Sequence, residues 1–302
     1  MSVLRQLPPW ATTGVGSLPF TDVEAAVDHA LSAYELPFCP QLPRLEGDMI
    51  TEWLGADPSR CGWSPARDRE RPRAWDTLLA RLSSTPAPHR VVKLQVTGPM
   101  TLACALERMD GAPSRLDALG LAHELAGWLA ANVSGQVRAL ALHGHDALVI
   151  VDEPALHLFG TGEVDAVWDP LRAVAPTWGL HLCGSVPWHT VVVAQPAVLS
   201  FDLALAPVEG EAADALRALL AGGTRVMWGV VQPHRGEHGL HGSARLAAAV
   251  AATGATGSQS LLSASCGTGR MSVRREHEIA TALWDCAHTA AAWPSGTTNA
   301  SR

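Results

Sequence analysis

One histidine and two cysteines carry reactive side chains at a spacing that indicates a possible shared site. His181 and Cys183 flank a single leucine, and Cys266 follows later in a Ser-Cys-Gly segment. In a β-strand, residues i and i+2 point to the same face, so the imidazole and the first thiol can converge on one ion. Zn²⁺ prefers such nitrogen and thiolate ligands, and a catalytic zinc site keeps one position open. A buried cysteine beside a hydrogen-bonded histidine is the alternative.

Composition restricts the classes of function. The 302 residues carry a formal net charge of -7 and contain no Lys/Arg-rich run, so neither nucleic acid nor a membrane is expected as a partner. No apolar stretch reaches the length of a transmembrane helix, and the first ten residues lack a signal-peptide core, which favours a cytoplasmic protein. The six cysteines are too dispersed for a disulfide framework and are expected as thiols or metal ligands.

Short β-rich segments alternate with longer segments of helical period along the chain, which is typical of a parallel sheet with crossover helices. Eight strands are expected, at residues 12–17, 37–41, 91–97, 147–152, 179–183, 198–202, 225–231 and 260–264. Helical periodicity covers residues 23–33, 75–82, 114–142, 164–174, 212–220, 244–252 and 274–291. The sequence therefore predicts an α/β fold, a single (β/α)8 TIM barrel over residues 1–293, with a disordered tail over 294–302.

Polar residues at the expected strand ends favour this barrel over a doubly wound open sheet. In (β/α)8 barrels the chemistry is carried by the carboxyl ends of the strands. The polar groups found there are Gly16, Ser17, Asp152, Glu153, His181, Cys183, Asp202, His234 and Cys266. An open sheet would have to gather them at one switch point, and no Gly-x-Gly-x-x-Gly follows the first strand.

Five segments, in order along the chain, resemble the C-terminal catalytic domain of cobalamin-independent methionine synthase, in the superfamily that includes uroporphyrinogen decarboxylase. They are TGVGSLP at 13–19, DMITE at 48–52, TGPMTL at 97–102, DEPAL at 152–156 and the His/Cys segments described above. Ordered matches at several strand ends are more specific than any one motif. The resemblance implies a methyltransferase that transfers a methyl group to the thiol of homocysteine and forms methionine.

The resemblance also implies a zinc site. His181, Cys183 and Cys266 match ligands of the family's Zn²⁺, and Asp202 stands where the family places a glutamate that completes the set. Zinc would favour the thiolate form of homocysteine near neutral pH and so make it a nucleophile. For Asp202, which is one methylene shorter than glutamate, an ordinary strand-end cap is the alternative.

Substrate-binding and acid roles follow from the same resemblance. Glu52 and Asp152 would hold the substrate ammonium, and the backbone amides of Gly16 and Ser17 would receive its carboxylate. The alternatives are a solvated helix residue for Glu52 and a helix N-cap for Asp152. His234 matches the family's proton-relay position, where an imidazole can protonate the leaving group.

The features that bind the methyl donor in this family are not matched. Full-length family enzymes have a second, N-terminal barrel that helps to bind methyltetrahydrofolate, and these 302 residues are expected to leave no room for it. Ala105 replaces the tryptophan that stacks on the pterin, and the segment after Pro154 is shorter. The donor therefore stays open between a folate and a methylated corrinoid protein.

Other functions also stay open. A methylcobalamin:thiol methyltransferase of the coenzyme M type is similar in His181, Cys183 and Cys266, but a sulfonate thiol has no obvious use for Glu52 and Asp152. A non-catalytic zinc-binding barrel is a third possibility. A uroporphyrinogen decarboxylase is a fourth, and this lyase would not need the cysteine ligands.

Overall fold

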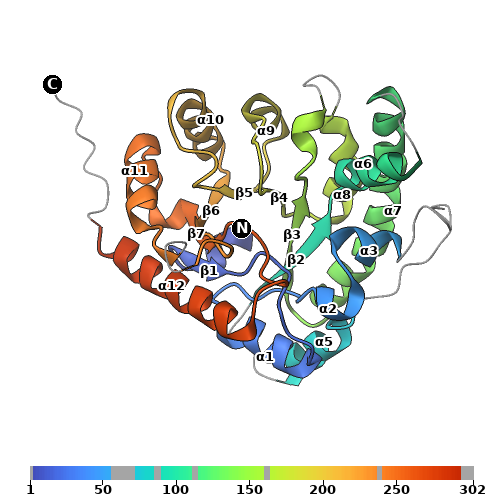
Figure 1. Ribbon diagram of the computed structural model, residues 1–302, viewed down its shortest axis with the longest axis horizontal. Coiled ribbons are helices and arrows are strands. Elements are labelled where there is room, and N and C mark those ends of the chain that lie inside the picture. Colours follow the sequence, from blue (N-terminus) through green and yellow to red (C-terminus); the bar gives the residue numbers. More distant parts are fainter. Residues whose placement is uncertain are drawn as a thin grey trace.

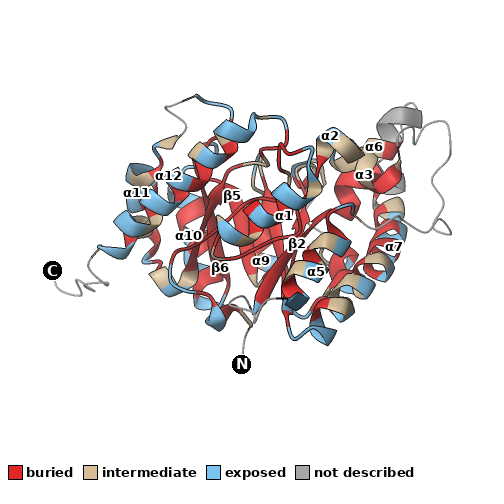
Figure 2. Cartoon of the chain, turned by 90° about the horizontal axis from the view of Figure 1, so that it is seen from below, coloured by how far each residue is buried: buried red, intermediate tan, exposed pale blue. Residues whose placement is uncertain are grey.

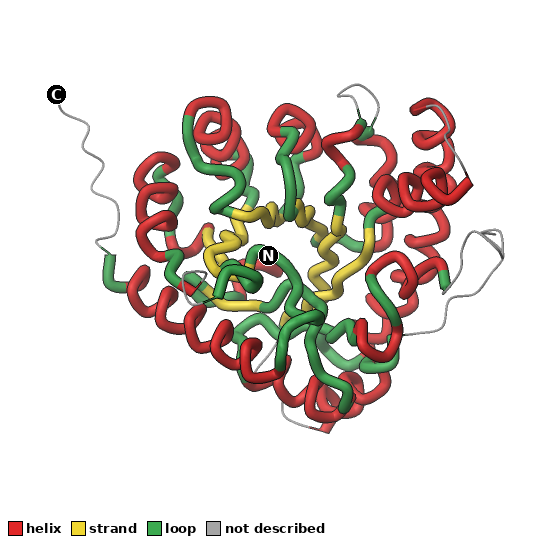
Figure 3. Tube along the Cα trace, in the orientation of Figure 1, coloured by secondary structure: helices red, strands yellow, loops and turns green. Residues whose placement is uncertain are grey.

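Seven parallel strands form the sheet of this protein, in the order β1-β7-β6-β5-β4-β3-β2. The computed structural model describes residues 3–55, 72–84, 90–110, 115–159, 164–236 and 240–293, and the expected tail over 294–302 lies outside these ranges. The strands are β1 (Ala11–Thr13), β2 (Val91–Thr97), β3 (Asp146–Asp152), β4 (Trp178–Leu182), β5 (Val198–Asp202), β6 (Arg225–Val231) and β7 (Ser260–Ala264). The sheet curls into an arc with the helices outside it, as in a TIM barrel (Figures 1 and 3).

The helices form the outer layer (Figure 1). They are α1 (Val23–Ser32), α2 (Pro43–Glu46), α3 (Met49–Leu54), α5 (Trp75–Ser84), α6 (Pro99–Asp110), α7 (Arg115–Leu142), α8 (Asp169–Val174), α9 (Trp188–Ala194), α10 (Gly210–Ala221), α11 (Ser243–Thr253) and α12 (Val273–Ala291). Side-chain caps begin α1, α3 and α12, where Asp22, Asp48 and Ser272 accept hydrogen bonds from first-turn amides. No helix among the described residues is long and apolar enough to cross a membrane.

The strands are buried on both faces, apart from the first two residues of β3 (Figure 2). A large apolar core includes the residues between sheet and helices, and a smaller core includes Leu4, Leu148, Ile150, Val198, Met227 and Leu261. Because alternate side chains of a strand share a face, Asp152, Ser200 and Ser263 follow members of the smaller core on the same face. This face of the sheet is therefore apolar along the earlier part of the strands and polar at their carboxyl ends.

The expected second strand is the part of the fold prediction that the structure corrects. Residues 36–41 lie between β1 and β2 but form no regular ladder. They pair through isolated parallel bridges, Ser17 with Gln41 and Phe38 with Lys93. Pro37 and Pro40 have no N–H to donate, which prevents a continuous strand. The α/β, TIM-barrel-like fold is confirmed with seven regular strands, and the closed eight-stranded barrel is not formed as such.

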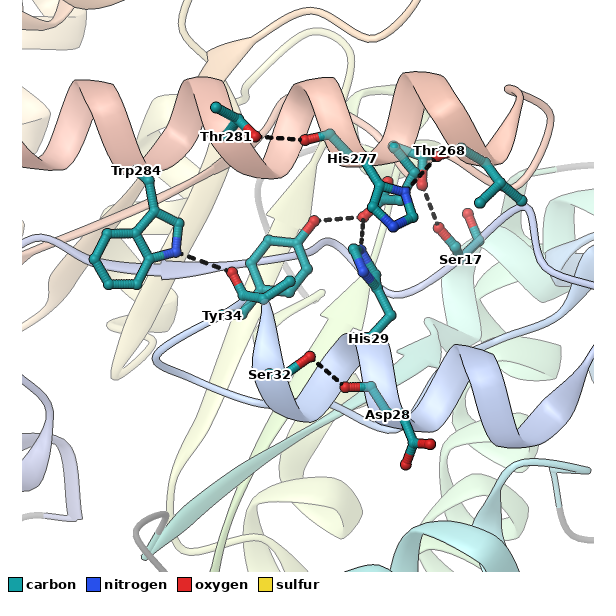
Figure 4. Close-up of polar contacts among 12 residues, drawn as sticks. Ser17, Asp28, His29, Ser32, Tyr34, Thr268, His277, Thr281 and Trp284 are labelled. Atoms are coloured by element: carbon teal, nitrogen blue, oxygen red, sulfur yellow. Dashed lines mark hydrogen bonds and ion pairs between the residues drawn. The ribbon is translucent and has the colours of Figure 1, made fainter.

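Residues on and just after α1 contact α12, which follows the last strand (Figure 4). Fully buried Glu276 of α12 accepts a hydrogen bond from the Tyr34 hydroxyl at 2.5 Å and pairs with His29 Nε2 at 3.0 Å. Burial and then the Glu276 charge raise the pKa of Tyr34. Trp284 Nε1 donates to the carbonyl oxygen of Ala33 at 3.1 Å. These contacts hold α12 against α1 and the segment that follows it.

Candidate active site

A cavity of about 390 Å³ lies at the carboxyl ends of the strands, which is a volume typical of small-molecule sites. Seven of the predicted site residues line it, namely Ser17, Glu52, Asp152, His181, Cys183, His234 and Cys266. Gly16 directly precedes Ser17 and is buried. A second hollow of about 530 Å³, lined by α12, the start of α11 and the loop before it, contains none of the predicted site residues.

The His181 imidazole is neutral and held in one orientation. Its Nδ1 hydrogen-bonds to the Ser200 hydroxyl of β5 at 2.8 Å. His181 and Ser200 lie side by side because they are partners in the pairing of β4 with β5. Burial, and then the charge of Lys93, lower the pKa of His181 to about 3. With Nδ1 used in this way, Nε2 is the nitrogen left for a ligand, and a neutral ring is the form that binds metals.

The two cysteines at the cavity are hydrogen-bonded to each other. This contact and the hydrogen bond with His234 lower the pKa of Cys266 to about 6, although burial opposes the shift. The same contact, followed by burial, raises the pKa of Cys183. The contact therefore favours the thiolate form of Cys266 and the thiol form of Cys183. A thiolate is both the nucleophilic and the metal-binding form of cysteine.

Asp202 is placed differently from the other predicted zinc ligands. Its carboxylate accepts hydrogen bonds from the amides of Ala204 at 2.8 Å and Leu205 at 3.3 Å, and from Gln232 Nε2. It does not line the cavity. The structure thus places Asp202 as a strand-end cap, and its role as fourth ligand stays a prediction that requires the carboxylate to leave this turn.

Asp152 ends a buried polar chain that begins at Lys93. The Lys93 ammonium donates to the Val15 carbonyl oxygen at 2.5 Å and to Gln95 Oε1 at 2.7 Å, and Gln95 Nε2 donates to Asp152 Oδ1. Burial lowers the pKa of Lys93 to about 7, against the opposing charge of Asp152. Burial also raises the pKa of Asp152, which the Gln95 hydrogen bond and the Lys93 charge counteract. The Oδ1 atom of Asp152 is thus held by a hydrogen bond from Gln95, which in turn contacts Lys93.

Glu153 faces away from the cavity and anchors the start of α6. Its carboxylate accepts hydrogen bonds from the amides of Met100 and Thr101, from the Thr101 hydroxyl and, at 3.4 Å, from Trp168 Nε1. A Cβ on Gly98 would lie 2.1 Å from the Glu153 carboxyl carbon, so this close approach requires glycine. The contact fixes the end of β3 and thereby the position of Asp152.

Glu52 reaches the cavity from α3, and Gln41 Nε2 donates to its Oε2 at 2.7 Å. Asp48, which caps this helix, and Arg270 also line the cavity. Backbone hydrogen bonds from the first turn of α3 lower the pKa of Asp48, and the charge of Arg270 adds to this effect. The cavity is therefore lined by three carboxyl groups, those of Asp48, Glu52 and Asp152. The exposed guanidinium of Arg270 also lines it.

The segment after Cys266 lies directly against Ser17 (Figure 4). The amide and hydroxyl of Thr268 both donate to the Ser17 carbonyl oxygen, at 2.9 and 3.1 Å, and the Gly269 amide donates to the Ser17 hydroxyl at 3.3 Å. A Cβ on Gly267 would lie 2.0 Å from that hydroxyl. Within the described residues, the amides of Gly16 and Ser17 make no hydrogen bond, which leaves them as donors for an anion.

His234 is exposed and follows β6, where its ring hydrogen-bonds with Cys266. Ala105 lies on α6 and does not line the cavity. The described residues that line the cavity include no Trp, Phe or Tyr. Within the described part of the chain, the site therefore offers an exposed imidazole and no Trp, Phe or Tyr ring on which a flat ligand could stack.

The donors at the cavity fit Zn²⁺ by their chemistry. Cys183, Cys266 and His181 bring two sulfurs and a neutral imidazole to one cavity, and such mixed sulfur and nitrogen sets suit zinc. Ser200 supplies the second contact that metal-binding histidines usually have. No group of three or more His, Cys, Asp or Glu side chains in the described ranges already has metal-binding spacing.

Sequence reasoning assigned no role to Lys93, Gln95 or Glu153. Lys93 is the only lysine of the chain, and it lies in an otherwise apolar strand with Gln95 two residues later on the same face. A lone lysine in a strand that is buried on both faces was the signal that could have revealed this polar chain.

Comparison with known proteins gives matches of structure only. No family model matches the chain, and no curated protein matches it in sequence. A B12-independent methionine synthase from Shewanella sp. W3-18-1, in complex with selenomethionine, matches with a TM-score of 0.53 and 16% identity over 74% of this chain and 67% of that chain. A methyltransferase from Methanosarcina mazei matches with a TM-score of 0.55 and 13% identity over 94% of this chain and 96% of that chain. The resemblance expected from the sequence is thus confirmed for the fold.

Proposed function

We propose that this protein is a zinc-dependent methyltransferase that methylates the thiol of homocysteine to form methionine. The observation that carries the proposal is one cavity that contains both a zinc-type donor set and a pair of acids. The donor set is His181, Cys183 and Cys266, and the acids are Glu52 and Asp152. The first set suits a thiol, and the second suits the ammonium group of an amino acid.

The shared fold supports methyl transfer as the class of reaction. One structural match is a methionine synthase in complex with selenomethionine, and the other is a methyltransferase. Since one fold can host unrelated functions, the argument for homocysteine depends on the site residues.

His181 Nε2 and the sulfurs of Cys183 and Cys266 are the groups that we propose to hold the metal. When bound, Zn²⁺ supplies a thiolate nucleophile by lowering the pKa of a thiol at its open position. Ser200 fixes the His181 ring, and the proton of the Cys183 thiol has to leave before both sulfurs can act as thiolate ligands.

The remaining cavity residues orient the amino acid. Asp152 and Glu52, which each accept a hydrogen bond from a glutamine amide, would also accept hydrogen bonds from the ammonium group. The amides of Gly16 and Ser17 would donate to the carboxylate. Because these groups lie on fixed strand and helix ends, they would hold the sulfur in one position for in-line attack on a methyl group.

We propose a methylated corrinoid rather than a free folate as the donor. The sulfur provides the electron pair for the new S–C bond, and the electron pair of the broken bond stays on the donor. Cobalt keeps this pair without a proton, whereas a folate nitrogen must be protonated, which His234 at the mouth could do. A pterin would also lack an aromatic partner, since Ala105 replaces the stacking residue and no described lining residue is Trp, Phe or Tyr.

Incubation of the zinc-loaded protein with homocysteine and one methyl donor at a time tests the proposal. The donors are methylcobalamin, methyltetrahydrofolate and S-methylmethionine, and methionine is followed by mass spectrometry. We expect methionine with methylcobalamin and little with free folate. Formation from folate alone at high rate would overturn the choice of donor, and no methionine with any of the three would overturn the reaction.

A further inference from the structure

A buried guanidinium lies at the amino ends of the strands, opposite the candidate active site. Arg225 is the first residue of β6 and is 9% exposed. Its Nη1 atom is buried and makes no hydrogen bond within the described residues. A buried charge normally has a hydrogen-bonding partner or a counter-ion, because its removal from water is unfavourable. The described part of the chain supplies no such partner for this atom of Arg225.

The strand places Arg225 beside the smaller apolar core. Alternate residues of a strand share a face, so Arg225 lies on the same face as Met227. Met227 belongs to the smaller core, together with Leu4 and with Val198, the partner of Arg225 in the pairing of β5 with β6. Leu4 lies on the short 3-10 helix η1 (Val3–Gln6), which precedes β1. The N-terminal segment thus packs on the end of the sheet at which Arg225 lies.

A second guanidinium lies near the first. Arg5 is an exposed residue of η1, and burial, followed by the charge of Arg5, lowers the pKa of Arg225. No carboxylate of the described ranges forms an ion pair with either arginine. Asp146, the first residue of β3, contacts η1 through Gln6 Nε2 at 3.0 Å instead. Two neighbouring like charges, one of them buried, favour the binding of an anion.

We propose that Arg225 and Arg5 form a binding site for a small, doubly charged oxyanion, with inorganic phosphate as the expected ligand. A guanidinium presents its N–H groups in a planar fork that matches the oxygens of phosphate. Two guanidinium groups match a dianion in charge, whereas a carboxylate would neutralise only one of them. The bound anion would link η1 to β6 and so hold the N-terminal segment against the smaller core.

Calorimetry with inorganic phosphate, in chloride buffer of constant ionic strength, tests the site on wild type, Arg225→Met and Arg5→Met. Sulfate, also a dianion, and acetate, with a single charge, are the other two probes. Arg245→Met, which removes an exposed guanidinium from α11, is the matched control. Thermal unfolding of the same proteins with and without phosphate measures the stabilisation. The control variant also shows the general effect of phosphate as a salt excluded from protein surfaces.

We expect about one phosphate per chain in wild type and in Arg245→Met, with an unfolding temperature that rises as phosphate is added. Sulfate should bind similarly, and acetate about tenfold more weakly. Arg225→Met and Arg5→Met should each weaken phosphate binding by about tenfold or more, the effect of one lost contact to a charged group.

No binding of phosphate or sulfate to wild type, or unchanged affinity in both site variants, would overturn the site. Acetate that binds as tightly as phosphate would overturn the choice of a dianion. If Arg225→Met does not fold, Arg5→Met decides alone. Hydrogen exchange locates the anion, since phosphate should slow exchange in η1 in wild type and not in Arg5→Met; equal slowing in both proteins would contradict the proposed link between η1 and β6.

Discussion

Glu153 gives a sharp test of the buried structure that positions Asp152. Its side chain is fully buried, and burial raises the pKa of the carboxyl from 4.5 to about 7 although four hydrogen bonds favour the charged form. An acid with a raised pKa in the folded state stabilises the fold most when it is protonated. Its contribution is therefore complete below about pH 4.5 and is lost as the pH rises through about 7.

The size of this effect follows from the difference in pKa. A difference of about 2.5, at 1.36 kcal/mol for each pKa unit, corresponds to about 3 kcal/mol, of which about 2.5 kcal/mol falls between pH 5 and pH 8. Glu153→Gln keeps the shape and cannot ionise. The free energy of unfolding of wild type, minus that of the variant, should thus decrease by about 2.5 kcal/mol from pH 5 to pH 8.

Urea unfolding of both proteins at the two pH values measures this difference, and titrations common to both proteins cancel. Glu124→Gln, on the exposed face of α7, is the matched control and should give a nearly constant difference. A constant difference for Glu153→Gln would refute the raised pKa. An increase with pH would mean that the amides of α6 outweigh burial and hold Glu153 ionised.

Three further predictions concern the cavity. Asp152→Asn and Glu52→Gln should each weaken homocysteine binding by about one to two powers of ten, because each removes a charge-assisted contact of roughly 1.5–3 kcal/mol; calorimetry with parallel zinc analysis checks this, and unchanged affinity in both would favour an acceptor without an ammonium group. His234→Ala should cripple folate-dependent turnover and largely spare corrinoid-dependent turnover, and equal losses in the two assays would remove its role as an acid. Asp202→Ala should lower zinc content less than loss of either cavity cysteine, since its carboxylate caps a turn and does not line the cavity; a complete loss of zinc would make it an essential ligand.

The fold was largely predictable because buried parallel strands read as short apolar runs. Strands β2, β5, β6 and β7 have the expected bounds, and β1 ends four residues earlier than expected. Helices α2, α3, α6 and α9 were not predicted, since they are short or begin within motifs that were interpreted as strand ends. The expected strand over 37–41 is irregular because its prolines interrupt the ladder.

The candidate site was predictable where a residue follows a strand directly. His181, Cys183 and Cys266 meet at the cavity as their strand positions indicated. Asp202 is also at a strand end, but its carboxylate accepts hydrogen bonds from the amides of Ala204 and Leu205. Residue spacing alone does not reveal such a local contact. The pairing of Gln95 with Asp152 depends on the register between β2 and β3, which the sequence does not state.

Metal analysis of three cysteine variants tests the zinc site most directly. Cys183→Ser and Cys266→Ser each remove a sulfur from the cavity, whereas Cys286→Ser removes a buried sulfur on α12 that contacts the Ser243 hydroxyl. We expect about one zinc per chain in wild type and in Cys286→Ser, and strong loss in both cavity variants. Full zinc occupancy in either Cys183→Ser or Cys266→Ser, or a wild-type protein that binds no zinc, would contradict the proposed zinc-dependent reaction.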